Sequence, residues 1–169
     1  DKLLNSSKDK AEHLMIVDLL RNDLGKICEY GSVNTKDLYN IKSFETIHHM
    51  ESKITGKLKK RTEFQDIIKA LFPGGSITGA PKERSMEIID ELEDYNRGIY
   101  TGTIGYLSSN KYMNFNIAIR TLSLNSQQGI YPVGGGIVWD STSEGERNEA
   151  LNKAKIMDVF LEKQIKEYA

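Results

Sequence analysis

The segment that decides the fold is FPGGSITGAPKERSMEIIDELE, residues 72–93. Gly74, Gly75 and Gly79 allow the backbone to form tight or left-handed turns. The glycine-rich part changes without a linker into an amphipathic helix that opens at Pro81. Proline suits the first turn of a helix because an N–H at that point has no helical partner. The segment therefore predicts a glycine-rich loop that leads directly into a helix N-terminus.

Two interpretations of this loop are open. It can be a turn that only caps a helix, or it can be an anion site, in which bare amides and the hydroxyls of Ser76 and Thr78 lead to a helix N-terminus. The residue order is neither the GxxxxGK[ST] of a phosphate P-loop nor the GxGxxG of a dinucleotide-binding fold. If the loop binds a ligand, that ligand is expected to carry a carboxylate or a phosphate.

Composition limits the class of protein. The chain has 169 residues, of which 38% are hydrophobic, so it can bury a core and form a single domain. Charged residues make up 28%, but the net charge is −1, which excludes the global basic field typical of proteins that bind nucleic acid or anionic lipid. The single cysteine, Cys28, excludes an internal disulfide framework and indicates a reducing compartment.

The hydropathy and the N-terminal residues of the sequence indicate the cellular compartment and whether the chain is part of a longer protein. No apolar run approaches the roughly 20 residues of a membrane-spanning helix, and no signal peptide is recognisable. The expected location is therefore the cytoplasm, with neither a membrane nor a nucleic acid as partner. The chain begins at Asp1 without a methionine, a few residues before an expected helix, so we expect it to be part of a longer protein.

Hydrophobic periodicity and turn residues predict helices before and after antiparallel hairpins. The expected elements are, in chain order, a helix from Ser6 or Ser7 to about Asn22, strands within 38–58, a short helix from a Thr62-x-x-Gln65 capping box to near Leu71, a helix over 81–93, strands over 98–109, 112–124 and 128–139, and a helix from about 143 to 166. This order favours an α+β fold over a parallel βαβ fold.

Two pairs of carboxylates have helical spacing. Asp9 and Glu12 are three residues apart on the first expected helix, and Glu146 and Glu149 are three apart on the last. This spacing places both members of a pair on one helical face, where like charges repel. A divalent cation held between the two helices would offset that repulsion, and Mg²⁺ prefers carboxylate oxygens completed by water and an anionic substrate.

A structural interpretation of the same acids is also open. Ser6-x-x-Asp9 and Ser143-x-x-Glu146 both fit capping boxes, which would explain one acid of each pair. Glu12 and Glu149 have no such explanation, although exposed glutamates are commonly just solvated. Spacing alone does not decide between a metal site and helix caps.

Two further groups of residues have unusual settings. His48 and His49 are adjacent in an expected strand, so their side chains should point to opposite faces and one of them should face the interior. Arg120 lies in the apolar run FNIAIRTL, residues 115–122, where an arginine is expected to meet an acid.

Five motifs together resemble one family. They are MIVDLLRNDLG (15–25), PGGSITGAPK (73–82), TGTIGYL (101–107), NIAIRTL (116–122) and GGGIVWDS (134–141). In this order they are similar to the C-terminal part of the chorismate-utilising enzymes, and most of all to the aminodeoxychorismate synthase component I group of the folate pathway. The resemblance implies an αββα sandwich of mainly antiparallel sheets with flanking helices, of which residues 1–169 would be the C-terminal part of the chorismate-binding catalytic domain.

The resemblance also implies roles for individual residues. It implies Mg²⁺ as cofactor, with Glu12 and Glu149 as ligands and Asp9 and Glu146 as a partly water-mediated outer pair. The residues that it implies for the substrate are Tyr106 and Arg120, which would grip the enolpyruvyl carboxylate, and Gly134, Gly135 and Gly136, which would offer backbone N–H groups. The residues that it implies for catalysis are His49, Ser76 and Lys82.

The activity implied is replacement of the 4-hydroxyl of chorismate by ammonia from a glutamine amidotransferase subunit. Two alternatives stay open: anthranilate synthase component I, which aminates the neighbouring ring carbon and releases pyruvate, and a non-catalytic binding module. The upstream PIKGT motif of the aminodeoxychorismate group, whose lysine is proposed to attack the ring, does not occur in residues 1–169. We therefore expect this chain to be inactive by itself.

Overall fold

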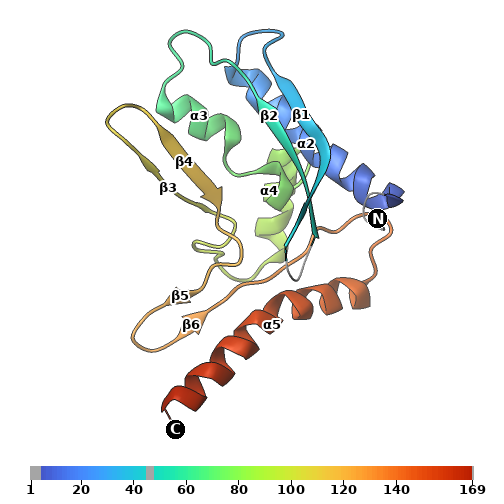
Figure 1. Ribbon diagram of the computed structural model, residues 1–169, viewed down its shortest axis with the longest axis vertical. Helices are drawn as coiled ribbons and strands as arrows, with labels where there is room; N and C mark the ends of the chain where they lie inside the picture. Colours follow the sequence, from blue (N-terminus) through green and yellow to red (C-terminus); the bar gives the residue numbers. More distant parts are fainter. Residues whose placement is uncertain (1–4, 45–47, 169) are drawn as a thin grey trace. The chain divides into compact units, whose positions relative to one another are not determined.

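The computed structural model describes residues 5–44 and 48–168, with side chains for 5–7, 9–44 and 48–158. The chain divides into two compact units, Asp1–Asp94 and Tyr95–Ala169, and each unit is described by itself. Both contain helices and small antiparallel sheets (Figure 1), which confirms the predicted α+β class. Among the described residues, no helix is long and apolar enough to cross a membrane.

The first unit begins with helix α2, Ser7–Ile27. The Ser6 hydroxyl caps it by accepting a hydrogen bond from the amide of Asp9 at 3.2 Å, as the sequence predicted. The helix does not end near Asn22, because helical hydrogen bonding continues until the amide of Cys28 donates to the carbonyl of Leu24. The predicted end was therefore too early.

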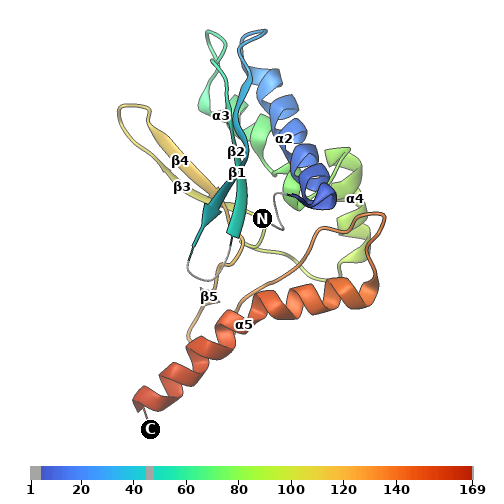
Figure 2. The same cartoon turned by 45° about the vertical axis from the view of Figure 1, so that its right-hand side comes forward.

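The hairpin that follows consists of β1, Asn34–Ser43, and β2, His48–Thr55. The strands pair antiparallel, with an irregularity between Lys36 and Asn40. This confirms strands in the predicted region, although β1 begins four residues before the predicted start at 38. Helix α2 contacts both strands and lies along one face of the hairpin, as Figure 2 shows from a second direction.

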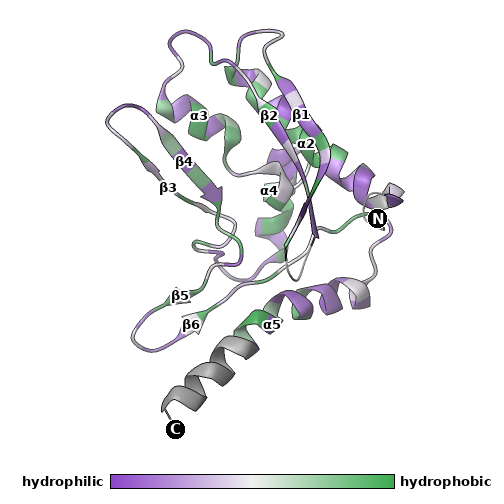
Figure 3. Cartoon of the chain, in the orientation of Figure 1, coloured by the Kyte–Doolittle hydropathy of each residue, from purple (hydrophilic) through white to green (hydrophobic). Residues whose placement is uncertain are grey.

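Helix α3, Phe64–Leu71, is capped one residue later than predicted. Its capping box is formed by Glu63 and Asp66, because the Thr62 hydroxyl instead donates to the carbonyl of Ile27 at 3.4 Å. The helix carries both hydrophobic and hydrophilic residues (Figure 3). Its hydrophobic residues complete the core of this unit, which consists of Ile27, Cys28 and Ala70 together with Leu24, Val33, Ile67 and Leu71.

The glycine-rich segment forms a short 3-10 turn, η1, Gly75–Ile77, and then helix α4, Lys82–Leu92. The loop leading directly into a helix is confirmed, with Pro81 as the residue before the first helical one. Gly75 is buried against α2, and a Cβ added there would lie 3.2 Å from Leu19 Cδ1. Glycine is therefore needed for the close approach of the loop to α2.

Two other glycines give a test of this packing. A Cβ added at Gly56 would lie 2.6 Å from the Sγ of Cys28, whereas one added at Gly25, inside α2, would meet nothing within 4 Å. We expect Gly56→Ala to lower the free energy of unfolding by about 1–3 kcal/mol through overpacking. Gly25→Ala should raise it by about 0.5–1 kcal/mol, because alanine favours the helix. Urea unfolding of both variants checks this; equal effects would contradict the packing described.

The second unit contains four short strands and a long helix. The strands are β3, Thr103–Leu107, β4, Met113–Ile117, β5, Ser123–Leu124, and β6, Gly129–Ile130, and the helix is α5, Ser143–Tyr168. Strand β3 pairs with β4 and β5 with β6, both antiparallel. The helix begins at the predicted residue, but the three long predicted strands are wrong in extent.

The strands are shorter for local reasons. Residues 98–102 form turns, in which the amide of Tyr100 donates to the carbonyl of Arg97 and that of Gly102 to Ile99. The predicted strand 112–124 is divided in two near Arg120, which has a left-handed φ of +52°. Such a φ is incompatible with an extended strand.

Candidate functional site

The two acids of the first unit that the sequence predicts as metal ligands, Asp9 and Glu12, lie near the start of α2. Asp9 and Glu12 are both half-buried, and the amide of Asp9 takes part in the Ser6 cap. The next residue, His13, turns to the hairpin, where its Nε2 lies 2.7 Å from the Ser52 hydroxyl. The N-terminal part of α2 is thus fixed against β2 by polar contacts as well as by packing.

The two acids of the second unit that the sequence predicts as metal ligands, Glu146 and Glu149, lie near the start of α5. The hydroxyl of Thr142 caps this helix, accepting from the amide of Gly145 at 3.2 Å, so the predicted capping box of Ser143 and Glu146 is wrong. Glu146 instead accepts a hydrogen bond from the Ser141 hydroxyl at 2.6 Å. Its other oxygen, Oε2, is buried and has no hydrogen-bond partner within the described part of the chain. Glu146 therefore has no capping role and holds an unsatisfied carboxylate oxygen.

The glycine run 134–136 lies against this carboxylate. A Cβ added at Gly135 would be 2.6 Å from Oε2 of Glu146 and 3.6 Å from Oε1 of Glu149. Glycine at this position allows the backbone to approach both acids. The structure thus brings two groups of predicted site residues together in the second unit, the glycine run and the acids Glu146 and Glu149.

Lys153 is part of the same cluster and was missed by the sequence reasoning. Its Nζ forms an ion pair with Oε1 of Glu149 at 2.5 Å and donates to the carbonyl of Gly134 at 2.8 Å. The spacing of four residues between Glu149 and Lys153 was a signal for this contact, because such pairs are neighbours on a helix. The lysine compensates the charge of Glu149 and ties α5 to the glycine run.

Two carboxylates of the second unit offer oxygens of the chemical type that binds a hard cation. The unsatisfied, buried Oε2 of Glu146 beside Glu149 is the kind of oxygen that Mg²⁺ prefers. Among the side chains that the structure describes (5–7, 9–44 and 48–158), however, no three His, Cys, Asp or Glu residues gather in a way that could hold a metal ion. Each unit supplies one pair, Asp9 with Glu12 and Glu146 with Glu149. The four-carboxylate Mg²⁺ site stays a prediction.

The predicted carboxylate clamp lies on the sheet of the second unit and just beyond it. Tyr106, in β3, is exposed, with its ring 6.0 Å from that of Tyr112. Arg120 follows β4 and is also exposed, and no hydrogen bond or ion pair involves it in the described part of the chain. The expectation that Arg120 meets an acid inside a strand is therefore wrong. Its guanidinium is available to bind a carboxylate ligand, which an arginine fork suits.

His48 and His49 are both exposed, so the prediction that one of them faces the interior is wrong. Nδ1 of His48 lies 2.9 Å from the Ser43 hydroxyl, and the His49 ring meets Phe44 edge-on at 5.8 Å. The catalytic role of His49 stays a prediction.

The glycine loop uses many of its polar groups internally. The amides of Ile77, Thr78 and Gly79 donate to the carbonyls of Gly74 and Gly75, and the Thr78 hydroxyl donates to Gly74 as well. These groups are not free to receive an anion, so the interpretation as a nest of bare amides loses its support. The Ser76 side chain is exposed beside them, and its role in catalysis stays a prediction.

Lys82 lies in a buried ion cluster. Its Nζ is 2.8 Å from Oδ2 of Asp23 and 3.4 Å from the carbonyl of Ala70. Asp23 is only 3% exposed and also receives Nζ of Lys26 at 2.7 Å. Burial alone would raise the pKa of Asp23, but the hydrogen bonds and charges of Lys26 and Lys82 lower the pKa below its usual value. Lys82 therefore joins α4 to α2 in this structure.

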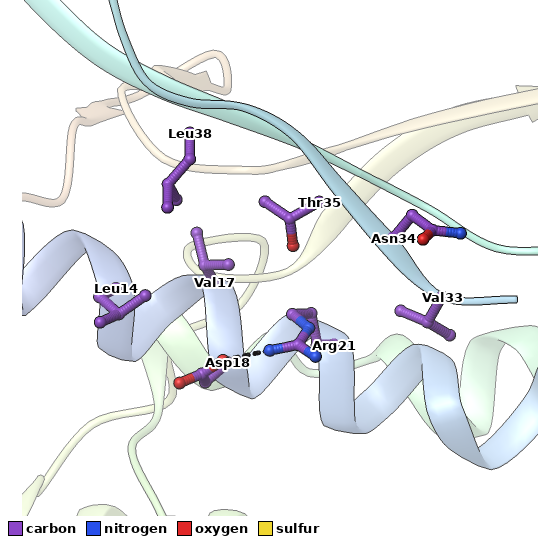
Figure 4. A pocket seen from close by; sticks show the side chains of 8 residues that line it. All are labelled: Leu14, Val17, Asp18, Arg21, Val33, Asn34, Thr35 and Leu38. Atoms are coloured by element: carbon purple, nitrogen blue, oxygen red, sulfur yellow. Dashed lines mark hydrogen bonds and ion pairs between the residues drawn. The ribbon is translucent and has the colours of Figure 1, made fainter. Parts of the chain in front are cut away.

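A pocket of about 280 Å³ lies between α2 and β1 (Figure 4). Leu14 and Val17 of α2 and Leu38 of β1 give it apolar walls, and the Asp18–Arg21 ion pair lies on its α2 side. None of the residues predicted for catalysis, substrate or metal lines this pocket. It is separate from the candidate site.

Comparison with known proteins gives relatives in two enzyme groups. The chain is 53% identical over 154 residues to a "Probable aminodeoxychorismate synthase, chloroplastic" of Oryza sativa subsp. japonica, covering 91% of this chain and 17% of that protein. It is 49% identical over 162 residues to "Aminodeoxychorismate synthase component 1" of Escherichia coli, covering 96% and 36%. It is 45% identical to "Anthranilate synthase component 1" of Saccharolobus solfataricus, covering 95% and 38%.

A solved structure agrees with these matches. The crystal structure of anthranilate synthase component I from Streptococcus pneumoniae superposes with a TM-score of 0.85 at 44% identity, covering 91% of this chain and 35% of that one. The relatives confirm the predicted resemblance to aminodeoxychorismate synthase component I. The chain spans between 17% and 38% of the length of these curated relatives. Because residues 1–158 match the family described as chorismate binding enzyme, the chain belongs to that family.

Proposed function

We propose that this chain is part of an enzyme that aminates chorismate to 4-amino-4-deoxychorismate in the folate pathway, with ammonia from a glutamine amidotransferase partner. The observation that supports this most is the identity of 53% and 49% to two relatives named aminodeoxychorismate synthase, although identities to that group extend down to 44% and overlap the 43–45% to relatives named anthranilate synthase. The name "component 1" of the Escherichia coli relative supports a second component as partner.

Anthranilate synthase component I is the second candidate. It is favoured by the 45% identity to the Saccharolobus solfataricus protein and by the superposition on the Streptococcus pneumoniae structure. Both candidates act on chorismate and differ in the ring carbon that receives the amino group. The cytoplasm is the proposed location in either case.

The proposed mechanism assigns a role to each residue predicted for substrate binding or catalysis. Arg120 and Tyr106 bind the enolpyruvyl carboxylate, and the glycine run 134–136 donates backbone N–H groups to the same substrate. His49 and Ser76 lie beside the ring and the departing 4-hydroxyl, and Lys82, when not paired with Asp23, would add positive charge near the loop. These roles place charged and polar groups where the substrate carries its carboxylates.

Magnesium is the proposed cofactor. Glu12 and Glu149 would hold the ion, with Asp9 and Glu146 as the outer pair, and the ion would neutralise the ring carboxylate of chorismate and the charge that develops as the hydroxyl leaves. The unsatisfied Oε2 of Glu146 supports this assignment. Because the chain spans at most 38% of the relatives reported above, we also propose that it forms only part of the active site and is inactive alone.

Identification of the product tests the proposed function. The complete enzyme that contains this sequence should convert chorismate, ammonium and Mg²⁺ to 4-amino-4-deoxychorismate, measured by chromatography. Formation of anthranilate and pyruvate instead would replace the proposal by the second candidate. Absence of any product, with chorismate still bound, would favour a non-catalytic module.

Removal of the metal gives a further prediction. Chelation should abolish the activity, and Glu149→Gln should lower it at least about tenfold, because ligand and near-ligand changes at metal sites have effects of that size or larger. The Mg²⁺ concentration for half-maximal activity should rise as well. Glu144→Gln is the matched control, because Glu144 is also an exposed acid in the N-terminal part of α5. Equal activity of the two variants would remove Glu149 from the proposed metal site.

A further inference from the structure

A groove rich in cations lies at the C-terminal end of α2, and none of the site residues proposed above lines it. It has a volume of about 450 Å³ and is formed by the end of α2, the loop before α3, and α3 itself. We call it the basic groove, and its lining residues are Lys26, Ile27, Lys59, Lys60, Arg61, Thr62, Asp66, Lys69 and Ala70. All of these residues belong to the first unit.

Two of the cations in the basic groove have structural partners. Nζ of Lys26 binds Asp23 at 2.7 Å, and Nζ of Lys59 donates to the carbonyl of Lys26 at 2.7 Å. Lys59 thereby satisfies a carbonyl in the last turn of α2, where a positive charge is also favoured by the helix dipole. These two lysines are explained by the end of the helix.

The other three cations have no such explanation. Lys60, Arg61 and Lys69 are exposed, and the described residues offer them no ion pair or side-chain hydrogen bond. The one acid in the lining, Asp66, uses its Oδ2 to accept from the amide of Glu63 at 2.9 Å in the cap of α3. Apart from Lys26, which pairs with Asp23, the lining therefore carries four cations, Lys59, Lys60, Arg61 and Lys69, and one anion, Asp66, which gives a net charge of +3.

The concentration of charge is local. The whole chain has a net charge of −1, so the groove does not follow from a general excess of cations. Like charges around a concave surface reinforce one another's potential and raise the local concentration of anions. The floor adds rigidity, because Ile27 and Ala70 are each 7% exposed and belong to the core of the unit.

We propose that the basic groove binds a compact multivalent oxyanion, a small molecule with two or more phosphate or carboxylate groups. The groove is shallow and open, so the ligand would be held by charge more than by enclosure. No aromatic residue of the described part of the chain lines it. Single-stranded nucleic acid is therefore a poorer match, because proteins bind it by stacking bases on aromatic side chains. The proposal does not depend on the function proposed for the chorismate site.

Calorimetric titration of the protein with tripolyphosphate and with citrate tests the proposal, at an ionic strength of about 0.15 M to screen non-specific attraction. The test variant is Lys60→Gln/Arg61→Gln/Lys69→Gln. The matched control is Lys36→Gln/Lys53→Gln/Lys155→Gln, which removes the same charge from three exposed lysines outside the groove. We expect one-to-one binding that weakens about tenfold or more in the test variant, because three of the cations that would contact the anion are lost together, and that is unchanged in the control.

The outcomes separate the sources of the anion and the competing explanations. Binding of tripolyphosphate but not citrate assigns phosphate chemistry to the groove, and the reverse assigns carboxylate chemistry. Equal weakening in both variants, or absence of saturable binding, overturns the proposal. A single-stranded oligonucleotide that binds the groove and is not displaced by tripolyphosphate also overturns it. Thermal unfolding without ligand and turnover of chorismate should be the same in all variants, which keeps this test distinct from that of the proposed function.

Discussion

Replacement of Arg120 by alanine in the complete enzyme should weaken chorismate binding by about 2–5 kcal/mol, the usual range for removing one partner of a buried, hydrogen-bonded charge pair, which Arg120 would form with the bound carboxylate. The side chain is exposed and has no partner within the described residues, so it is available to the substrate carboxylate. Arg120→Lys should recover only part of the loss, because an ammonium lacks the planar fork that matches a carboxylate. The dissociation constant of chorismate, measured by calorimetry, checks both variants.

Arg147→Ala is the control for this prediction. Arg147 is exposed in α5 and takes part in no ion pair among the described side chains, so its loss removes the same charge without touching the proposed clamp. Thermal unfolding of the Arg120 variants should match that of the parent protein. Chorismate affinity that is unchanged in Arg120→Ala would show that the clamp is wrong.

Replacement of Asp23 by alanine should lower the free energy of unfolding by about 3 kcal/mol or more, as expected when one partner of a buried ion pair is removed. Asp23 is 3% exposed and binds both Lys26 and Lys82, so its loss leaves Lys82, whose side chain is 21% exposed, without its counter-ion. Asp18→Ala is the matched control, because its ion pair with Arg21 is exposed and should contribute less than about 1 kcal/mol. Urea unfolding of both variants measures the difference.

The Asp23 contribution should also depend on pH. Its folded-state pKa is lowered, so the stabilisation is fully present above the unfolded-state pKa of about 4 and is lost as the pH falls through the folded-state value. The difference in unfolding free energy between the parent protein and Asp23→Asn should therefore shrink in acid below about pH 4. A difference that stays constant in acid would show that the charge of Asp23 is not what stabilises the fold.

The sequence predicted the helices well because local signals dominate there. The Ser6 cap and the transition at Pro81 both place helix starts within one residue of those observed. Errors arose where a tertiary contact competed with a local one. Thr62 has the right position for a capping box, but its hydroxyl bonds the end of α2, and Glu63 caps α3 instead. The strands of the second unit were too long because β propensity does not show where the chain must turn.

The candidate site was predictable as a set of residues but not as a set of contacts. Helical spacing predicted that Glu146 and Glu149 lie on one face of a helix. Only the structure shows that both lie close to the glycine run 134–136. The spacing of four residues between Glu149 and Lys153 predicts their ion pair. Nothing in the sequence predicts the hydrogen bond from Lys153 to the carbonyl of Gly134. Arg120 was misjudged because an apolar neighbourhood in sequence does not imply burial when the backbone leaves the strand.

The contact of Lys82 with the carbonyl of Ala70 restrains the glycine loop that lies between these two residues. By reaching back to the carbonyl of Ala70, Lys82 closes a segment of twelve residues on itself, at the point where three glycines make the free chain most flexible. Closing a short loop lowers the entropy of its open states, and glycine has the most entropy to lose. The Ser76 hydroxyl is therefore presented from a preorganised loop, and a ligand that binds there need not order the backbone first.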